Sequence, residues 1–389
     1  MIMQWFFAMF FRFEPLPHEP LMACETYTMA TELNKPQNSL TMKWILFLTF
    51  IICMTACNNT GESNTNSTES LKHTDTAIGK SIGTLEKMDP ALDAIVSPGA
   101  KSEIIAEGLD WSEGPLWLEK INALVFSDVP QNIVYKWTAE KGKEVYLTPS
   151  GYTDSAKRGG EMGSNGLTLD NNGQLLLCQH GNRQVARMTS GVDNPQPLFA
   201  TVAGKYKGMR FNSPNDVIVD SKGQVYFTDP IYGLESQSDK DPKKETPYNG
   251  VYKVKTDGTV VLLVDSITRP NGIALSPDEK KLIIACSDPE KPNWYIYDVD
   301  ENGLKNGKIF YSCVGQDKTL PGLPDGFKID KNGTVFASGP GGVRIFNMEG
   351  KLLGMLKLEN ATSNIAFSPD QKTIYITNDM YVLRWKLRD

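Results

Sequence analysis

The stretch that decides the fold runs from Phe211 to Pro230 and reads FNSPNDVIVDSKGQVYFTDP. It holds two runs of β-branched and aromatic residues, 217–219 and 225–228, joined by a Ser-Lys-Gly turn. Two such runs joined by a glycine-containing turn are typical of a β-hairpin. We therefore expect the polar pair Asn215-Asp216 to lie where the first strand of this hairpin begins.

The same hairpin pattern recurs along the chain, and each copy starts with a carboxylate or a carboxamide. The leading residues are Glu113, Asn165, Asn215, Asn271, Asp325 and Asn364. A second hairpin follows the first; after Asn215, for example, it comprises residues 250–254 and 260–263. Each repeat therefore provides four strands in roughly fifty residues, which matches one blade of a β-propeller.

These repeats predict an all-β protein, a six-bladed β-propeller with four-stranded blades. The last repeat is incomplete, because its third strand, residues 381–385, lies almost at the C-terminus. Residues 101–106 (KSEIIA) precede the first repeat and can supply the missing outer strand. We expect this N-terminal strand to close the ring, which hides two sheet edges at once.

The beginning of the chain has features of a secreted protein. Residues 1–41 resemble nothing that follows, and we interpret them as an extension upstream of the true start at Met42. Residues 42–57 hold a lysine, an apolar run and the sequence Met-Thr-Ala-Cys, as in a signal peptide. Cys57 resembles the cysteine of a bacterial lipobox, which is acylated and becomes the new N-terminus. The alternative is an ordinary signal peptide with a chance cysteine.

Residues 58–95 are rich in Asn, Ser, Thr and Gly, which predicts a flexible tether before a propeller domain at 96–389. A lipid on Cys57 would attach the protein to a membrane without spanning it. We therefore expect a lipid-anchored protein of the bacterial cell envelope, facing the periplasm or the cell surface.

Composition excludes several classes of function. The net charge is −6 and no basic run with interleaved aromatics occurs, which argues against a nucleic-acid partner. Of the 3 histidines, only His180 lies in the predicted domain, and no Gly-x-Ser-x-Gly, HExxH or P-loop motif is present. The widely spaced Cys178, Cys286 and Cys313 give no disulfide framework, and we interpret them as core residues.

After these exclusions, the domain still offers carboxylate and amide oxygens that can bind a metal ion. The innermost strands of a propeller line a central channel, so the leading residues of the repeats should converge there. Carboxylate and amide oxygens suit hard divalent cations such as Ca²⁺, Mg²⁺ or Mn²⁺. Glu113 and Asp325 would neutralise the ion, while the amides would add uncharged ligands. The alternative is that these polar residues make turn and cap hydrogen bonds at strand starts.

Several segments, in order, carry a resemblance to a known family. They are 112–117 (SEGPLW), 178–183 (CQHGNR), 210–216 (RFNSPND), 227–234 (FTDPIYGL), 270–272 (PNG) and 324–326 (PDG). Together they make roughly 105–388 similar to the gluconolactonase branch of the senescence-marker-protein (regucalcin), gluconolactonase and luciferin-regenerating-enzyme family. The resemblance implies a six-bladed propeller with one divalent metal ion in its channel, in a family where many members hydrolyse lactones.

The resemblance also implies a metal site. The metal-binding Glu, the blade-four Asn and the blade-five Asp of the family fall on Glu113, Asn271 and Asp325, and its blade-three Asn-Asp pair falls on Asn215-Asp216. We expect the metal ligands Glu113, Asn215, Asn271 and Asp325 to hold one divalent cation, Ca²⁺ first, with Mg²⁺, Mn²⁺ or Zn²⁺ as alternatives.

Two positions depart from patterns seen in the family. Where the animal branch carries a substrate-binding Arg, this chain has Ser213, and the nearest arginine is Arg210. Gly326 stands where some lactonases carry a serine ligand, which favours sugar lactones as substrates.

The predicted function is metal-dependent hydrolysis of a gluconolactone-like sugar lactone to its aldonic acid. The metal would polarise the carbonyl, and Asp325 would act as general base toward water. The expected substrate-binding residues are Asn165, His180, Arg210, Asp216 and Tyr232. The alternatives are a non-catalytic glycan- or protein-binding propeller, and a hydrolase or lyase for another sugar derivative.

Overall fold

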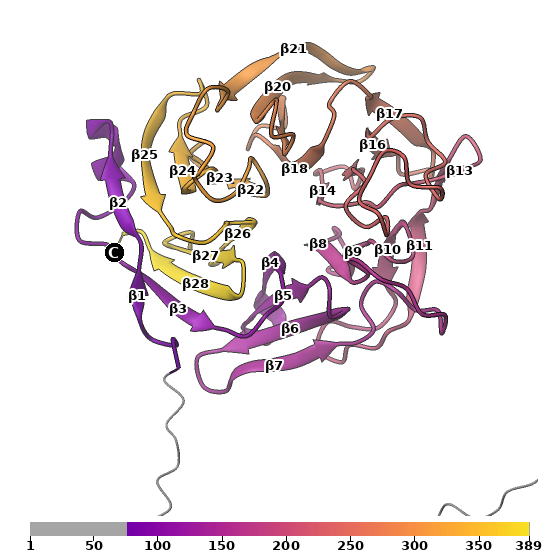
Figure 1. Ribbon diagram of the computed structural model, residues 1–389, viewed down its shortest axis with the longest axis horizontal. Coiled ribbons are helices and arrows are strands. Elements are labelled where there is room, and N and C mark those ends of the chain that lie inside the picture. The colour runs from indigo at the N-terminus through magenta and orange to yellow at the C-terminus, as the bar shows by residue number, and fades with distance from the viewer. Residues whose placement is uncertain (1–75, 389) are drawn as a thin grey trace, which may run out of the picture. The chain divides into compact units, whose positions relative to one another are not determined.

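Six antiparallel sheets stand around a common centre in the computed structural model, which describes residues 76–388 (Figure 1). Each sheet is one blade, and the strand that starts at or just after the leading residue of its repeat lies nearest the centre. No α-helix occurs among the described residues, only the short 3₁₀ turns η1 (Pro90–Ala94) and η2 (Glu119–Ile121). The predicted all-β, six-bladed propeller is confirmed.

The blades follow one another in chain order. Blade one contains β4 (Ser112–Leu118), β5 (Ala123–Asp128), β6 (Ile133–Thr138) and β7 (Gly142–Leu147). Blade two contains β8 (Ser164–Leu169), β9 (Leu175–Gln179), β10 (Gln184–Met188) and β11 (Phe199–Ala203). Blade three contains β14 (Val217–Val219), β15 (Val225–Asp229), β16 (Gly250–Val254) and β17 (Val260–Val264). A small ribbon between blades two and three consists of β12 (Lys205–Tyr206) and β13 (Met209–Arg210).

The second half of the ring repeats this arrangement. Blade four contains β18 (Pro270–Leu275), β19 (Lys281–Cys286), β20 (Asn293–Asp300) and β21 (Gly303–Ser312). Blade five contains β22 (Phe327–Ile329), β23 (Val335–Gly339), β24 (Gly342–Phe346) and β25 (Leu352–Lys357). Blade six contains β26 (Asn364–Phe367), β27 (Thr373–Asn378) and β28 (Tyr381–Lys386), completed by the N-terminal strand β3 (Ser102–Ala106).

The ring is closed by pairing of the two ends of the domain. β3 runs antiparallel to β28, with Ala106 opposite Val382 and Ser102 opposite Trp385. This pairing confirms the predicted closure. Because the outer strand of blade six comes from the N-terminus, the fold is complete only when the segment near residue 102 meets the segment near residue 385.

The N-terminal segment contributes more to the sheets than the sequence predicted. β1 (Ser81–Ile82) pairs with β3, and β2 (Thr84–Lys87) adds a fifth strand to blade five by pairing with β25. Leu92 of η1 is 1% exposed and belongs to the apolar core shared by blades five and six. The predicted tether over 58–95 is therefore wrong for this last part, because its few apolar side chains are used in packing.

The other N-terminal predictions concern residues outside the described part of the chain. They are the upstream extension 1–41, the signal peptide 42–57 with Cys57, and the tether up to residue 75. No helix among residues 76–388 is both long and apolar enough to cross a bilayer.

Apolar side chains fill the spaces between neighbouring blades. Phe211, for example, packs edge-on against Phe227 and Tyr252, at centroid distances of 5.0 and 4.9 Å. Cys178, Cys286 and Cys313 are free and buried within such clusters, so their interpretation as core residues is confirmed. This packing holds the inner strands in fixed positions around the channel.

Candidate active site

The leading residues of the repeats meet at one end of the channel. Each lies within or just before an inner strand. All but Asp325 are buried, with Glu113 and Asn215 only 2% exposed, and Asp325 is partly exposed with its Oδ1 buried. All of them except Asn364 face a cavity of about 410 Å³. The leading residues that line it are Glu113, Asn165, Asn215, Asn271 and Asp325. All four predicted metal ligands are therefore brought to one cavity.

Glycines behind the leading residues let the inner strands approach closely. A Cβ on Gly114 would lie 2.1 Å from the backbone oxygen of Asn165, and one on Gly272 would lie 2.3 Å from that of Asp325. A Cβ on Gly326 would lie 2.0 Å from Cγ of Asn364. A serine at 326 would thus overlap the Asn364 amide in this backbone arrangement, which gives a structural reason for glycine there.

Glu113 and Asp325 are two buried carboxylates without a positive partner. Burial raises the pKa of Glu113 to about 8, and the negative charges of Asp216 and Glu161 add to the shift. The pKa of Asp325 is also raised well above its usual range by burial and by the charge of Glu113. Within residues 76–388, neither carboxylate forms an ion pair with a lysine, arginine or histidine. The pair therefore calls for protons or a bound cation.

The leading residues of the repeats form a ring of polar side chains, and the hydrogen bonds within this polar ring leave acceptor oxygens free. Oδ1 of Asp325 and Oδ1 of Asn165 are buried and have no hydrogen-bond partner. Asn271 donates its Nδ2 to Oγ of Ser287 at 2.8 Å, which leaves its carbonyl oxygen for the channel. Such unpaired buried acceptors fit a hard divalent cation, which takes oxygen ligands from carboxylates and amides.

The charge of the site comes from few groups. The described residues contain no cluster of three or more His, Cys, Asp or Glu side chains placed to hold a metal. Two carboxylates supplemented by amide oxygens are consistent with this finding, since amides fall outside that set of residues. A divalent cation at this site would therefore need amide oxygens besides the two carboxylates, and Asn165, Asn215 and Asn271 line the same cavity.

The predicted substrate-binding residues do not all reach the cavity. Asn165 and Tyr232 line it. Asp216 is buried beside the ring, where its carboxylate accepts from the backbone N–H groups of Val217 and Ile273. Its charge therefore acts on Glu113 and Asp325 without its oxygens facing the cavity.

Arg210 and His180 lie away from the cavity wall. The guanidinium of Arg210 donates to the backbone oxygen of Asn182 at 3.0 Å. The side chain of His180 is fully buried, and its Nδ1 lies 3.3 Å from Oε2 of Glu161. The structure thus brings His180 next to a cavity residue, but not to the cavity itself.

Four polar residues at the cavity were missed by the sequence analysis, namely Glu161, Gln237, Ser287 and Thr362, and the first two come from loops. Glu161 lies in the connection between β7 and β8, and Gln237 lies in the long connection between β15 and β16. Oε1 of Glu161 accepts from Nε2 of Gln237 at 3.2 Å. Neither residue has a fixed place in the repeat, and loop length was the signal that could have drawn attention to them.

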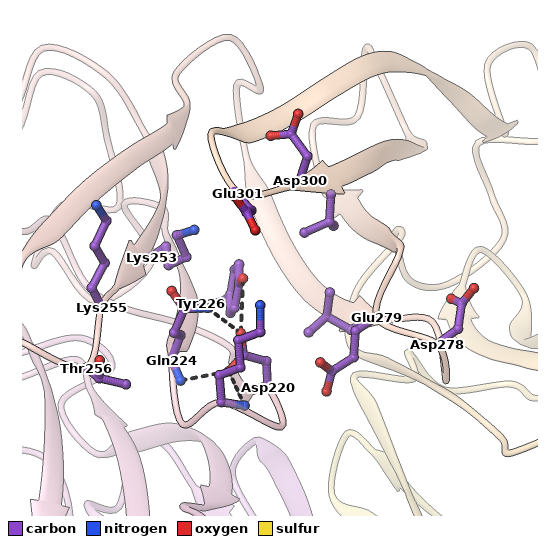
Figure 2. Close-up of a pocket in the computed structure, with 13 residues that line it drawn as sticks. Asp220, Gln224, Tyr226, Lys253, Lys255, Thr256, Asp278, Glu279, Asp300 and Glu301 are labelled. Carbon is purple, nitrogen blue, oxygen red and sulfur yellow. Dashed lines mark hydrogen bonds between the residues drawn. The ribbon is translucent and has the colours of Figure 1, made fainter.

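A larger cavity of about 720 Å³ lies between blades three and four (Figure 2). It is lined by Asp220, which follows the end of β14, whereas Asn215 precedes the start of that strand. Asp220 uses its carboxylate to accept from the backbone N–H groups of Lys222 and Gln224 within its own turn. This cavity therefore lies at the far end of the blades and contains none of the ring residues.

A six-bladed propeller with an oxygen-rich ring at one end of its channel is the class of protein that these observations define. The family model for the SMP-30/Gluconolactonase/LRE-like region matches residues 111–379, and the chain belongs to this family.

Several of the similar proteins are lactonases. The chain is 40% identical to a gluconolactonase of Zymomonas mobilis over 313 residues, which cover 79% of this chain and 86% of the relative. It is 24% identical to the pentonolactonase XacC of Haloferax volcanii over 270 residues, 68% of this chain and 80% of the relative.

A solved gluconolactonase structure from Xanthomonas campestris superposes with a TM-score of 0.67 at 27% identity, covering 81% of this chain and 99% of that one. Because the chain belongs to this family and is similar to these lactonases, it is an enzyme of the lactonase type. The non-catalytic binding propeller considered from the sequence is therefore set aside.

Proposed function

We propose that this lactonase opens a sugar lactone of the gluconolactone type to its aldonic acid with the help of one divalent cation. One observation carries the proposal: the buried Glu113 and the Asp325 carboxylate, whose Oδ1 is buried, face the same cavity as Asn215 and Asn271. The gluconolactonase of Zymomonas mobilis, at 40% identity, supports the choice of substrate class.

Glu113, Asn215, Asn271 and Asp325 would hold the cation. When bound, it would polarise the lactone carbonyl and stabilise the negative charge that develops on the carbonyl oxygen. An all-oxygen donor set favours Ca²⁺ first, with Mg²⁺ and Mn²⁺ next and Zn²⁺ as a weaker alternative.

Asp325 is the proposed general base. Its Oδ1 is buried at the cavity and has no hydrogen-bond partner, so it is free to accept a proton from water. As the proton leaves, the water oxygen bonds to the carbonyl carbon; the ring C–O bond then breaks and the ring oxygen takes up a proton. Tyr232 and Asn165 line the cavity and are proposed to hydrogen-bond the lactone.

The test is acid release from D-glucono-1,5-lactone by the purified protein after chelation and reloading with Ca²⁺, Mg²⁺, Mn²⁺ or Zn²⁺, with spontaneous hydrolysis subtracted. We expect cation-restored turnover, and a loss of about 100-fold or more in Asp325→Ala and Glu113→Ala. Cation binding without turnover would favour the alternative, a hydrolase or lyase for another sugar derivative.

We also propose that the protein is anchored to the cell envelope by a lipid on Cys57. The support is the sequence alone, namely the apolar run and Ala-Cys ending of residues 42–57. This placement would have the enzyme act on lactones outside the cytoplasm.

A further inference from the structure

A carboxylate and a buried imidazole form a pair at the wall of the active-site cavity. Oε2 of Glu161 lies 3.3 Å from Nδ1 of His180. Glu161 comes from the connection that precedes β8, and His180 directly follows β9. Glu161 lines the cavity, whereas His180 lies behind it. The predicted role of His180 as a substrate contact does not explain this arrangement.

His180 is an unusual buried residue because its imidazole makes no well-aligned hydrogen bond and has the Glu161 carboxylate as a charged neighbour. The residue is 0% exposed, and neither ring nitrogen makes a hydrogen bond of good geometry, although Nδ1 lies 3.3 Å from Oε2 of Glu161. Burying a polar group without a hydrogen bond is unfavourable, so each such group calls for an explanation. A Cβ on Gly233 would lie 2.5 Å from Cβ of His180, so the missing side chain at 233 makes room for the imidazole.

Glu161 is held on both sides but keeps acceptor capacity. Its Oε1 accepts from Gln237 and its Oε2 lies beside His180. An ionised carboxylate has about four acceptor positions, so others remain for groups in the cavity. Its side chain is 22% exposed, and its charge contributes to the raised pKa values of both Glu113 and Asp325. Glu161 lines the same cavity as Glu113 and Asp325, so its carboxylate can meet the molecule that binds there.

We propose that Glu161 recognises the ring hydroxyls of the lactone and that His180 is the positioning residue that fixes its carboxylate. A carboxylate accepts hydrogen bonds and donates none, so it cannot bind the lactone carbonyl or ring oxygen, but it binds hydroxyl groups strongly. A lactone without hydroxyls would leave this half-buried charge unpaired, and a site of this kind discriminates against such analogues. The inference rests on the proposed function.

The first test compares two lactones that share a six-membered ring, D-glucono-1,5-lactone with hydroxyls and δ-valerolactone without them. We expect Glu161→Gln to lower the ratio of their kcat/KM values by about 10- to 100-fold, mainly through KM for the sugar lactone. An unchanged ratio would overturn the inference. Loss of Mn²⁺ binding by this variant would also overturn it, because Glu161 would then serve the cation.

The second test concerns the positioning role of His180. Asparagine can place an N–H near the position of Nδ1, whereas leucine keeps the volume and removes the donor. We expect His180→Asn to retain most of the discrimination between the two lactones. We expect His180→Leu to lose it: KM for the sugar lactone should rise by a larger factor than kcat for δ-valerolactone falls. Equal discrimination in both variants at matched melting temperatures would assign His180 to packing alone.

A third measurement separates this inference from the proposed function. 1,5-Anhydro-D-glucitol has the sugar ring and hydroxyls but no carbonyl, so it cannot be hydrolysed. We expect saturation-transfer NMR to show that it binds the wild type and binds Glu161→Gln at least about 10-fold more weakly. Such binding without turnover of either lactone would overturn the proposed function alone. Lactone turnover with Glu161-independent binding would overturn the inference alone.

Discussion

Nδ2 of Asn364 donates a hydrogen bond to Oε2 of Glu113 at 3.3 Å, joining the last blade of the propeller to the first. Asn364 begins β26 and Glu113 lies in β4, next to the seam that β3 and β28 close. Glu113 Oε2 also accepts from the backbone N–H of Gly114 at 2.9 Å. The orientation of the proposed cation ligand Glu113 therefore depends partly on Asn364, which is close in space but lies near the other end of the sequence.

Removal of this hydrogen bond is expected to weaken cation binding. In Asn364→Ala, the Glu113 carboxylate loses a donor, and a hydrogen bond to a charged group contributes about 1.5–3 kcal/mol. We expect the Kd for Mn²⁺, measured by electron paramagnetic resonance on chelated protein, to rise about 10-fold or more.

Asn378→Ala is the matched control for this change. Asn378 is also a buried asparagine of blade six, and it donates to the backbone oxygens of Asn360 and Ala361. Its removal should lower the melting temperature without changing the Kd for Mn²⁺ by more than about 2-fold. An equal rise in Kd for both variants would mean that blade stability, and not the Asn364–Glu113 contact, controls the site.

The raised pKa of Glu113 makes the stability of the cation-free protein depend on pH. Its pKa is about 8 in the folded chain against an ordinary value of 4.5, so the folded state binds this proton more tightly than the unfolded state. The resulting contribution to stability is fully present below about pH 4.5 and is lost as the pH rises through about 8. We expect the chelated protein to melt roughly 5 °C lower or more at pH 9 than at pH 6.

The same protons compete with the cation. Added Ca²⁺ should restore the melting temperature chiefly at the higher pH, because the carboxylates must lose their protons to act as ligands. Glu113→Gln removes the titrating group and should flatten the pH dependence of melting in chelator. A pH dependence as steep in Glu113→Gln as in the wild type would show that other groups cause it.

The repeats made most of the fold predictable. Each hairpin pattern is local, and the leading residue holds one place in it, so Glu113, Asn271 and Asp325 could be aligned from the sequence alone. The missing strand of blade six followed from counting strands, and the pairing of β3 with β28 confirmed it. These features depend on periodicity, which a single sequence displays.

Contacts made outside the repeats could not be predicted in this way. Glu161 lies in a connection with no counterpart in other blades, so nothing in its spacing marks it as a cavity residue. Leu85 and Leu92 are isolated apolar residues in a polar segment, and they pack against blade five, which follows much later in the chain. Arg210 is the arginine nearest to Asn215 in the sequence, but its side chain contacts the backbone of Asn182 and not the cavity.

The proposed lipid anchor predicts where the protein is found in a bacterial host. The wild type should fractionate with membranes, and mass spectrometry should find a mature chain that begins with an acylated Cys57 and contains no peptide from residues 1–41. Cys57→Ser should move the protein out of the membrane fraction, while Cys53→Ser, in the same apolar segment, should leave it there. Membrane fractionation of Cys57→Ser at the wild-type level would contradict the anchor.

The strands before residue 96 should contribute measurably to stability. A chain that begins at residue 96 lacks β2, which pairs with β25 from Thr84–Lys357 to Lys87–Gly354, and lacks Leu92, which is 1% exposed. We expect calorimetry to show a melting temperature roughly 10 °C lower, and Leu92→Ala in the full chain to cost about 2–5 kcal/mol. Ile78→Ala, at a residue that is 52% exposed, is the control and should have little effect. If the shortened and full chains had equal melting temperatures, the segment before residue 96 would act only as a tether.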